Sequence, residues 1–202
     1  TRDNRERLAA WGVPAHRIEL IPAGVDFQRV QRAPRGSDAL DIVFVGNLLR
    51  NNGIYTFVET LGYLRRQGIP VKAGLVGAGP EEAGLRALAK ELGAESAIKF
   101  YGQIEDIDQM LSVVKSAKVF IYATAMEGGW SIAALEAQAA GLPVVTVRDG
   151  RLGKCEVVVD GYNGLLADRE DPTLLGDRVA EILKSDELRA RLGRQAVEFA
   201  RG

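Results

Sequence analysis

Short apolar runs alternate with longer amphipathic segments over most of the chain. The runs at residues 40–45, 70–76, 97–101, 118–122, 143–147 and 164–167 have the length of buried strands. Between and after them, helical spacing of apolar positions marks segments 53–67, 80–92, 106–116, 131–140, 172–184 and 187–200, with a further short helix expected near 153–159. This order predicts an α/β fold with a doubly wound parallel sheet, right-handed crossovers and helices on both faces.

The first 40 residues follow a different pattern. Residues 2–11 read as the end of a helix that Gly12 and Pro14 stop, and residues 17–21 alternate as a short strand. Residues 28–39 are polar and contain Pro34, Gly36 and Ser37, so we expect a linker or long loop there. This stretch is too short to divide the chain, so residues 1–202 are expected to form one domain with residues 1–36 as a lead-in.

Composition and charge exclude several classes of protein. With 26 Lys and Arg against 27 Asp and Glu, the net charge of −1 gives no global field for nucleic acid or an anionic membrane. A single cysteine, Cys155, excludes internal disulfides, and with the single His16 it leaves no cluster for structural zinc. No stretch approaches the length of a membrane span, and a cytoplasmic location is expected. Because the chain opens on a polar, helix-like segment without an initiator Met, we expect it to be part of a longer protein.

Small-residue loops follow the predicted strands, at the sheet edge where open α/β sheets bind ligands. The first loop begins at Gly46 and carries the hydrogen-bonding side chains of Asn47, Arg50 and Asn52. These side chains are candidate ligand contacts. The alternative is a plain turn in which an asparagine caps the next helix.

The second and third loops contain glycine beside apolar residues. Gly77 and Gly79 follow a strand, but the next glycine comes five positions after Gly79, where a dinucleotide fingerprint needs three. Either these glycines form a tight turn that clears space for a neighbouring ligand, or they contact it directly. In the third loop, Tyr101 and Ile104 flank Gly102 and could hold a planar base, unless they are simply core residues.

The fourth loop joins the strand at 118–122 to the helix at 131–140, and we interpret it as the centre of the candidate site. Gly128 and Gly129 allow close approach to a ligand, and the helix that follows offers its free N–H groups to an anion. Glu127 precedes this turn, and Glu136 lies within the helix among alanines. An unpartnered carboxylate on an apolar helix face is costly, so Glu136 needs a partner such as ribose hydroxyls, unless it lies on the solvated side.

Five stretches of the chain, taken together, resemble one known family. They are residues 20–26, 43–46, 76–81, 136–145 and 156–166. In this order and spacing the chain is similar to the nucleotide-binding C-terminal domain of the retaining family-4 glycosyltransferases, the glycosyl transferases group 1, which have the GT-B fold. The resemblance implies a Rossmann-like half of a GT-B fold that binds a nucleotide diphosphate sugar, UDP- or GDP-linked, as substrate. It implies no cofactor and no metal, and an acceptor bound by a preceding N-terminal domain.

The resemblance also implies roles for individual residues. Glu136 matches the second glutamate of the family's pair and would bind the ribose hydroxyls, whereas Glu127 matches the first and would face the donor sugar as the catalytic residue. Backbone N–H groups of residues 128–131 would contact the sugar and phosphates. This turn consists of Gly128, Gly129, Trp130 and Ser131. Residues 101–104 would hold the base, and Gly46 and Gly77 would line the site.

Two departures from the family pattern concern the same site. The family usually holds the phosphates with an Arg and a Lys, and the matching positions here are Asn47 and Asn52. Arg50, or Lys154 in a later glycine-rich loop, could supply the missing charge, although a shifted Arg differs in geometry. Eight residues separate Glu127 from Glu136, where the family has seven. An extra glycine in the turn could absorb this residue, or Glu127 points elsewhere.

Two rival hypotheses remain beside the glycosyltransferase. A degenerate binding or regulatory module would keep the fold without donor chemistry, which the two asparagines favour and Glu136 opposes. A nucleotide-sugar epimerase of the same fold would need an acid and a base, and the chain offers only His16 as a histidine.

Overall fold

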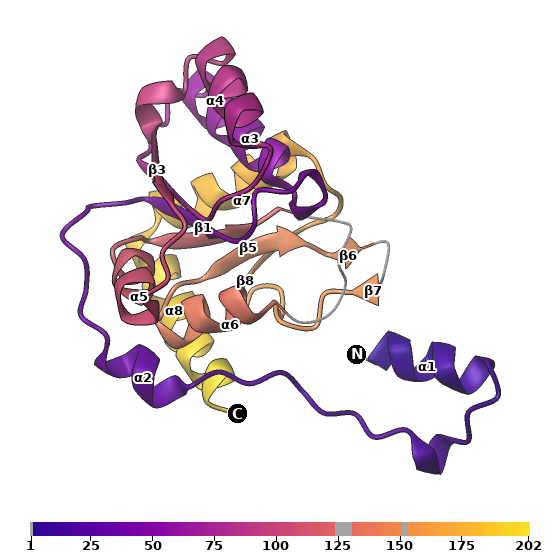
Figure 1. The fold of residues 1–202 in the computed structure, drawn as a ribbon. Coiled ribbons are helices and arrows are strands. Elements are labelled where there is room, and N and C mark those ends of the chain that lie inside the picture. The colour runs from indigo at the N-terminus through magenta and orange to yellow at the C-terminus, as the bar shows by residue number, and fades with distance from the viewer. Residues whose placement is uncertain (1, 124–130, 151–152) are drawn as a thin grey trace.

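The computed structural model describes residues 2–123, 131–150 and 153–202, and its elements alternate as the hydrophobic pattern predicts (Figure 1). The α-helices are α1 (Arg2–Ala10), α2 (Phe27–Arg32), α3 (Ile54–Arg66), α4 (Glu82–Glu91), α5 (Ile107–Lys115), α6 (Ile132–Ala139), α7 (Pro172–Lys184) and α8 (Asp186–Arg201). The strands are β1 (Ile42–Val45), β2 (Ala73–Val76), β3 (Ile98–Gly102), β4 (Val119–Tyr122), β5 (Val144–Val147), β6 (Asp149–Gly150), β7 (Gly153–Lys154) and β8 (Gly164–Ala167). Short 3-10 helices occupy Ala15–Arg17, Arg50–Asn52 and Glu95–Ala97.

The main sheet has six parallel strands in the order β3-β2-β1-β4-β5-β8. The chain builds outward from β1 to β3, returns to the centre, and builds outward again from β4 to β8. The predicted doubly wound parallel sheet is therefore confirmed. In such a sheet the switch point lies between β1 and β4, and ligands bind beside it at the carboxyl ends of the strands.

Both faces of the sheet are covered by helices, as Figure 1 shows, with α3, α4 and α7 on one side and α5 and α6 on the other. Alternate residues of β1 enter the two cores: Ile42 and Phe44 pack against α3, whereas Val43 packs toward α5 and α6. All three side chains are fully buried. Burial on both faces explains why the strands appear in the sequence as continuous apolar runs.

Two predictions for the first 40 residues are wrong. Residues 17–21 form no strand: the sheet ends at β3 and β8, and the segment pairs with neither, leaving Ile21 79% exposed. Residues 28–39 are not simply a linker, because α2 begins before them. Asp26 caps this helix by accepting a hydrogen bond from the Arg29 N–H at 2.9 Å. Val30 anchors the helix in a third apolar cluster with Leu111.

The helix predicted near residues 153–159 is also wrong. In its place β6 and β7 pair antiparallel, with Asp149 opposite Lys154 and Gly150 opposite Gly153. The chain then continues without helix to Val157 and Val158, both of which are buried in the second core. Valine is β-branched, and such side chains are crowded by the preceding turn of a helix but pack well in an extended chain. Two adjacent valines therefore disfavour a helix at this point.

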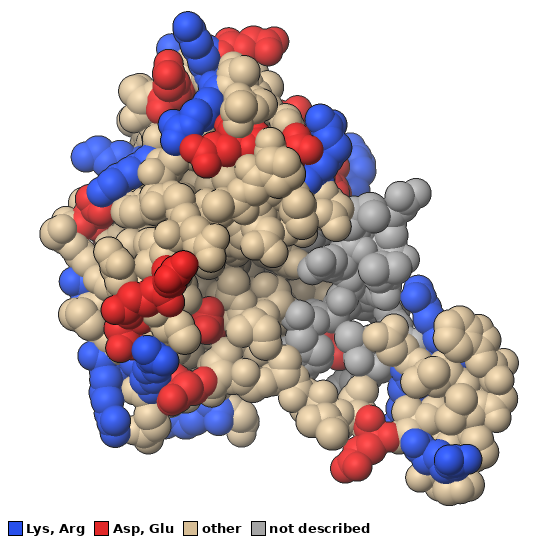
Figure 2. Space-filling view, viewed as in Figure 1, with Lys and Arg blue, Asp and Glu red and all other residues tan. Residues whose placement is uncertain are grey.

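Charges of both signs are mixed over the surface. On the face that Figure 2 shows, Lys and Arg side chains lie beside Asp and Glu side chains, which agrees with the near-neutral composition. No helix within the described residues is long and apolar enough to cross a membrane.

Candidate functional site

The loops that follow β1, β2 and β3 are hydrogen-bonded to one another through their backbones. The Gly46 N–H donates to the Val76 carbonyl at 3.0 Å, and the Leu48 N–H donates to the Ala78 carbonyl at 3.0 Å. One loop further out, the Gly77 N–H donates to the Gly102 carbonyl at 2.8 Å. These hydrogen bonds continue the pairing of the parallel strands past the strand ends. The backbones of the three loops therefore form one connected layer at the carboxyl edge of the sheet.

The glycines of the second loop allow this contact between backbones. A Cβ atom on Gly77, whose φ is +134°, would lie 1.9 Å from the Gly46 carbonyl oxygen. A Cβ atom on Gly79 would lie 2.4 Å from the Leu48 carbonyl oxygen. The space beside these two glycines is therefore filled by the loop after β1. From the sequence, these glycines either form a tight turn that clears space or contact a ligand directly. At these two Cβ positions, the neighbouring backbone fills the space.

Two polar side chains of the first loop, those of Asn52 and Arg50, contact neighbouring groups of the protein. The Asn52 side-chain amide donates to the Asn47 carbonyl oxygen at 2.9 Å and closes the loop on itself. Arg50 stacks over the Tyr55 ring, 4.5 Å from its centroid, and its Nη2 lies 4.0 Å from Glu81 Oε2. Its side chain is still 76% exposed, so Arg50 remains a charge that an anion at this loop can reach.

Tyr101 points away from the loops at the carboxyl edge. Its ring lies over Gly74 in the middle of β2, and its hydroxyl donates to Asp38 Oδ2 at 2.6 Å. Lys99 Nζ donates to the same carboxylate at 2.8 Å. Burial and the Asp38 carboxylate raise the pKa of Tyr101. This geometry supports the core interpretation for Tyr101, whereas Ile104, which is half-buried against the same core, lies beyond the strand end.

Helix α6 places Glu136 on a half-buried face. Ser131 caps the helix, its hydroxyl accepting a hydrogen bond from the Ala134 N–H at 3.3 Å. Glu136 shares its face with Ala133 and Ala140, which are also half-buried, while the residues between them are fully buried. The Glu136 carboxylate forms no hydrogen bond or ion pair within the described part of the chain. Burial raises its pKa, as expected for a carboxylate that lacks a compensating partner.

A second polar side chain of α6 is also incompletely satisfied. Gln138 is fully buried, and its Nε2 donates to the Val157 carbonyl at 2.8 Å. Its Oε1 has no partner within the described part of the chain. Four further predicted site residues, Glu127, Gly128, Gly129 and Trp130, lie outside the described residues, as does the side chain of Lys154. No group of three or more metal-ligating side chains occurs in the ranges 2–123, 131–150 and 153–202.

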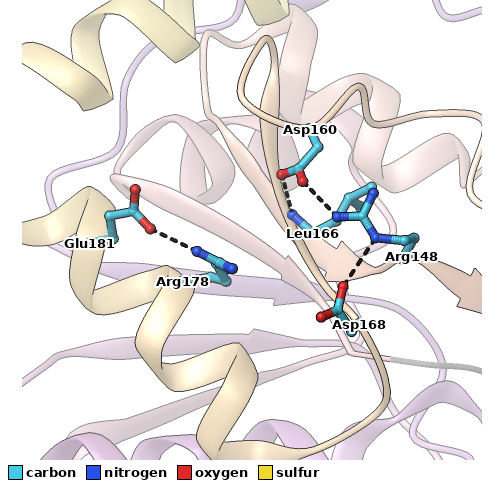
Figure 3. A network of polar contacts seen from close by, with 6 residues as sticks. All are labelled: Arg148, Asp160, Leu166, Asp168, Arg178 and Glu181. Atoms are coloured by element: carbon cyan, nitrogen blue, oxygen red, sulfur yellow. Dashed lines mark hydrogen bonds and ion pairs between the residues drawn. The ribbon is translucent and has the colours of Figure 1, made fainter.

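An ion-pair network that was not predicted from the sequence joins the end of β5 to the two ends of β8 (Figure 3). Arg148, directly after β5, donates to Asp160 Oδ2 at 2.7 Å and to Asp168 Oδ1 at 3.1 Å. Asp160 also accepts the Leu166 N–H at 3.0 Å. Arg148 thereby ties the segment after β5 to both ends of β8. The signal in the sequence is weak: an Arg at a strand end, with its two acids 12 and 20 residues further along the chain.

The network predicts how stability responds to pH. Burial acts to raise the pKa of Asp160, but the Leu166 N–H and the Arg148 guanidinium outweigh it and lower this pKa. Asp160 therefore adds stability above its unfolded pKa of about 3.9, and that contribution is lost as pH falls through the lower folded pKa. We expect Arg148→Gln to lower the urea unfolding midpoint slightly at pH near 7 and to change it little in strong acid.

Arg178→Gln is the control of equal charge, because Arg178 pairs with Glu181 within α7 at 3.1 Å. Arg178 makes no hydrogen bond to Asp160, and its charge is the smallest of the effects that lower the pKa of Asp160. Its substitution should move the midpoint less at neutral pH. An Arg148→Gln deficit that persists undiminished below the folded pKa of Asp160 would contradict the assignment.

The fold and the loops define a class of protein: a doubly wound α/β domain whose small-residue loops lie at the sheet edge where open α/β sheets bind ligands. A family model described as glycosyl transferases group 1 matches residues 27–199, and the chain belongs to this family. A curated relative, the D-inositol 3-phosphate glycosyltransferase of Corynebacterium urealyticum, is 30% identical over 91% of this chain and 47% of its own length. The chain thus spans about half the length of the curated relatives it matches.

Solved structures show the same fold. HepE of Anabaena, crystallised in complex with UDP, superposes with a TM-score of 0.84 at 20% identity, over 99% of this chain and 57% of that one. The C-terminal domain of a group 1 glycosyl transferase, LpcC of Francisella tularensis, superposes with a TM-score of 0.70 at 22% identity, over 89% and 93% of the two chains. The chain therefore has the fold of the C-terminal domain of a GT-B glycosyltransferase, as the resemblance predicts.

Proposed function

We propose that this chain is the donor-binding half of a retaining glycosyltransferase and binds a nucleotide diphosphate sugar at the carboxyl edge of its sheet. The observation that carries the proposal is Glu136, a half-buried carboxylate without a partner in the described part of the chain, on the helix beside the switch point. Two ribose hydroxyls would satisfy it. Membership of group 1 and the UDP complex of HepE support a nucleotide in this position.

The remaining roles are part of the same proposal. Glu127 would face the donor sugar, residues 128–131 would offer backbone N–H groups, and residues 102–104 would border the base. Transfer would rest on electrostatic stabilisation of the departing diphosphate, without a metal, by these N–H groups and by Arg50 and Lys154. An acceptor-binding domain before Thr1 belongs to the proposal as well, since the curated relatives are about twice as long as this chain. A cytoplasmic location is also part of the proposal.

The experiment is calorimetric titration of the chain with UDP, GDP and ADP in turn. Selective binding of one nucleotide is the expected result, and absence of binding to all three at millimolar concentration would sink the proposal.

Arg50→Ala should weaken the binding of the preferred nucleotide about tenfold, because one charge-assisted phosphate contact is lost. Arg86→Ala is the matched control. Arg86 is likewise exposed, paired with Glu82 at 2.8 Å and stacked on Phe100 at 3.9 Å, but it lies on α4 outside the loops of the site. Equal loss in both variants would mean that general charge, and not a contact at the first loop, is responsible.

A degenerate module without donor chemistry is the second candidate. It is favoured by the Asn52 amide, which bonds its own loop at the position where the family usually has a phosphate-binding Lys. If no nucleotide binds, this candidate stands. No observation on the site favours an epimerase, and the family assignment is to glycosyl transferases.

A further inference from the structure

A pocket of about 460 Å³ lies at the amino edge of the sheet, opposite the loops of the proposed donor site. Its walls are α8, the turn between α6 and β5, and the turn between α5 and β4. Helix α8 rests directly on the first of these turns, because a Cβ atom on Gly193 would lie 2.5 Å from the Gly141 carbonyl oxygen. Small and apolar residues, among them Ala117, Leu142 and Val197, line the space between the walls.

Every charged side chain that lines this pocket is positive. The five are Arg35, Lys115, Lys118, Arg189 and Arg194. They come from three separate segments of the chain, and no Asp or Glu of the described residues is among the lining residues. In a chain whose net charge is −1, this local excess of one sign is a property of the pocket and not of the overall composition.

Two of the five cations are paired with carboxylates outside the lining. Lys118 lies 2.7 Å from Asp41, and Arg189 lies 2.7 Å from Asp186. The first pair joins residues 77 apart in the sequence, and the second lies within the first turn of α8. Neither carboxylate pairs with any of the other three cations.

The other three cations have no carboxylate partner in the described part of the chain. Lys115 donates to the neutral carbonyls of Gln31 at 2.9 Å and Ala33 at 2.6 Å, and burial lowers its pKa. Its position in the last turn of α5 fits the helix dipole, but Arg35 and Arg194 have no such explanation. Both arginines are exposed and form no hydrogen bond or ion pair within the described residues.

We propose that this pocket binds the phosphate or diphosphate group of a ligand distinct from the sugar donor. Like charges held around one hollow repel, and an anion placed among them removes that cost. The guanidinium forks of Arg35 and Arg194 match phosphate oxygens, and Lys115 adds a point charge from the last turn of α5. The ligand is a phosphorylated soluble molecule or a lipid head group, which share this chemistry.

The test uses the whole chain with two probes. Pyrophosphate is titrated calorimetrically with UDP in excess, so that bound UDP keeps pyrophosphate out of the proposed donor site. If UDP does not bind, the pocket variant alone locates the pyrophosphate. Sedimentation with phosphatidylcholine vesicles, with and without phosphatidylglycerol, tests the lipid source. The variant is Arg35→Ala with Arg194→Ala, and the control is Arg17→Ala with Arg66→Ala, which removes the same charge from exposed positions outside the pocket.

We expect binding of at least one probe to weaken about tenfold or more in the pocket variant and to remain near wild type in the control. Pyrophosphate binding alone assigns a soluble ligand, and vesicle binding that pyrophosphate displaces assigns a head group. Failure of both probes to bind, or equal weakening in variant and control with circular dichroism unchanged, would overturn the proposal.

Discussion

Replacing Glu136 with glutamine is expected to weaken nucleotide binding about 30-fold, because two charge-assisted hydrogen bonds to ribose become neutral ones and each loses roughly 1 kcal/mol. The same substitution should leave the free energy of unfolding unchanged or raise it at neutral pH. The carboxylate is half-buried without a partner among the described residues, and burial raises its pKa. A binding loss together with equal or greater stability separates recognition from folding.

The pH dependence of that stability difference has a definite sign. Since the folded pKa of Glu136 lies above its unfolded value, the native state is penalised at higher pH and the penalty disappears as pH falls below the unfolded pKa of about 4.3. Wild type and Glu136→Gln should therefore converge in acid. The measurements are calorimetric titration and urea unfolding at several pH values. Full-strength binding by Glu136→Gln would remove this residue from the site.

The second large effect is expected from Gly77→Ala. A side chain at φ +134° is strained by about 1–3 kcal/mol, and the Cβ atom would lie 1.9 Å from the Gly46 carbonyl oxygen, so the two loops must separate. With loss of the hydrogen bonds between them, we expect about 4 kcal/mol of destabilisation, or roughly 10–15 °C in Tm for a chain of this size. Differential scanning calorimetry measures it.

Gly102→Ala is the matched control for this change. Gly102 also has a left-handed φ, +67°, but no atom lies within 4 Å of the Cβ position. Its substitution should cost only the backbone strain, about 1 kcal/mol. If the two variants have the same Tm, the close contact between the first and second loops does not stabilise the fold.

The fold was largely predictable because burial on both faces leaves a simple signature. Apolar runs such as residues 118–122 can hardly be anything but buried strands when helices separate them. The errors fell where long-range contacts decide. The sequence of residues 17–21 does not reveal that the segment lacks a strand to pair with. Helix α2 depends on the packing of Val30 with Leu111, which is distant in the sequence.

The position of the candidate loops in the fold was predictable, whereas the contacts of their side chains were not. Residue type and order located the loops at the carboxyl edge, and the resemblance located Glu136. The direction of a side chain is set by its surroundings: Tyr101 turns to Asp38, and Arg50 rests on Tyr55. The pairing of Arg148 with Asp160 and Asp168 joins segments that only the folded sheet brings together.

The hydrogen bonds that join the loops after β1, β2 and β3 have a consequence for exchanging specificity between relatives. Because Gly46 bonds Val76 and Gly77 bonds Gly102, none of these three loops can change its backbone path alone. In a chimera that receives one loop from a relative, the new loop does not match the two loops it must bond to. Transplanting all three loops with their glycines preserves the hydrogen bonds between them. If the domain binds a sugar donor as proposed, its donor preference should therefore be transferable as a block of three loops and should resist transfer of one loop at a time.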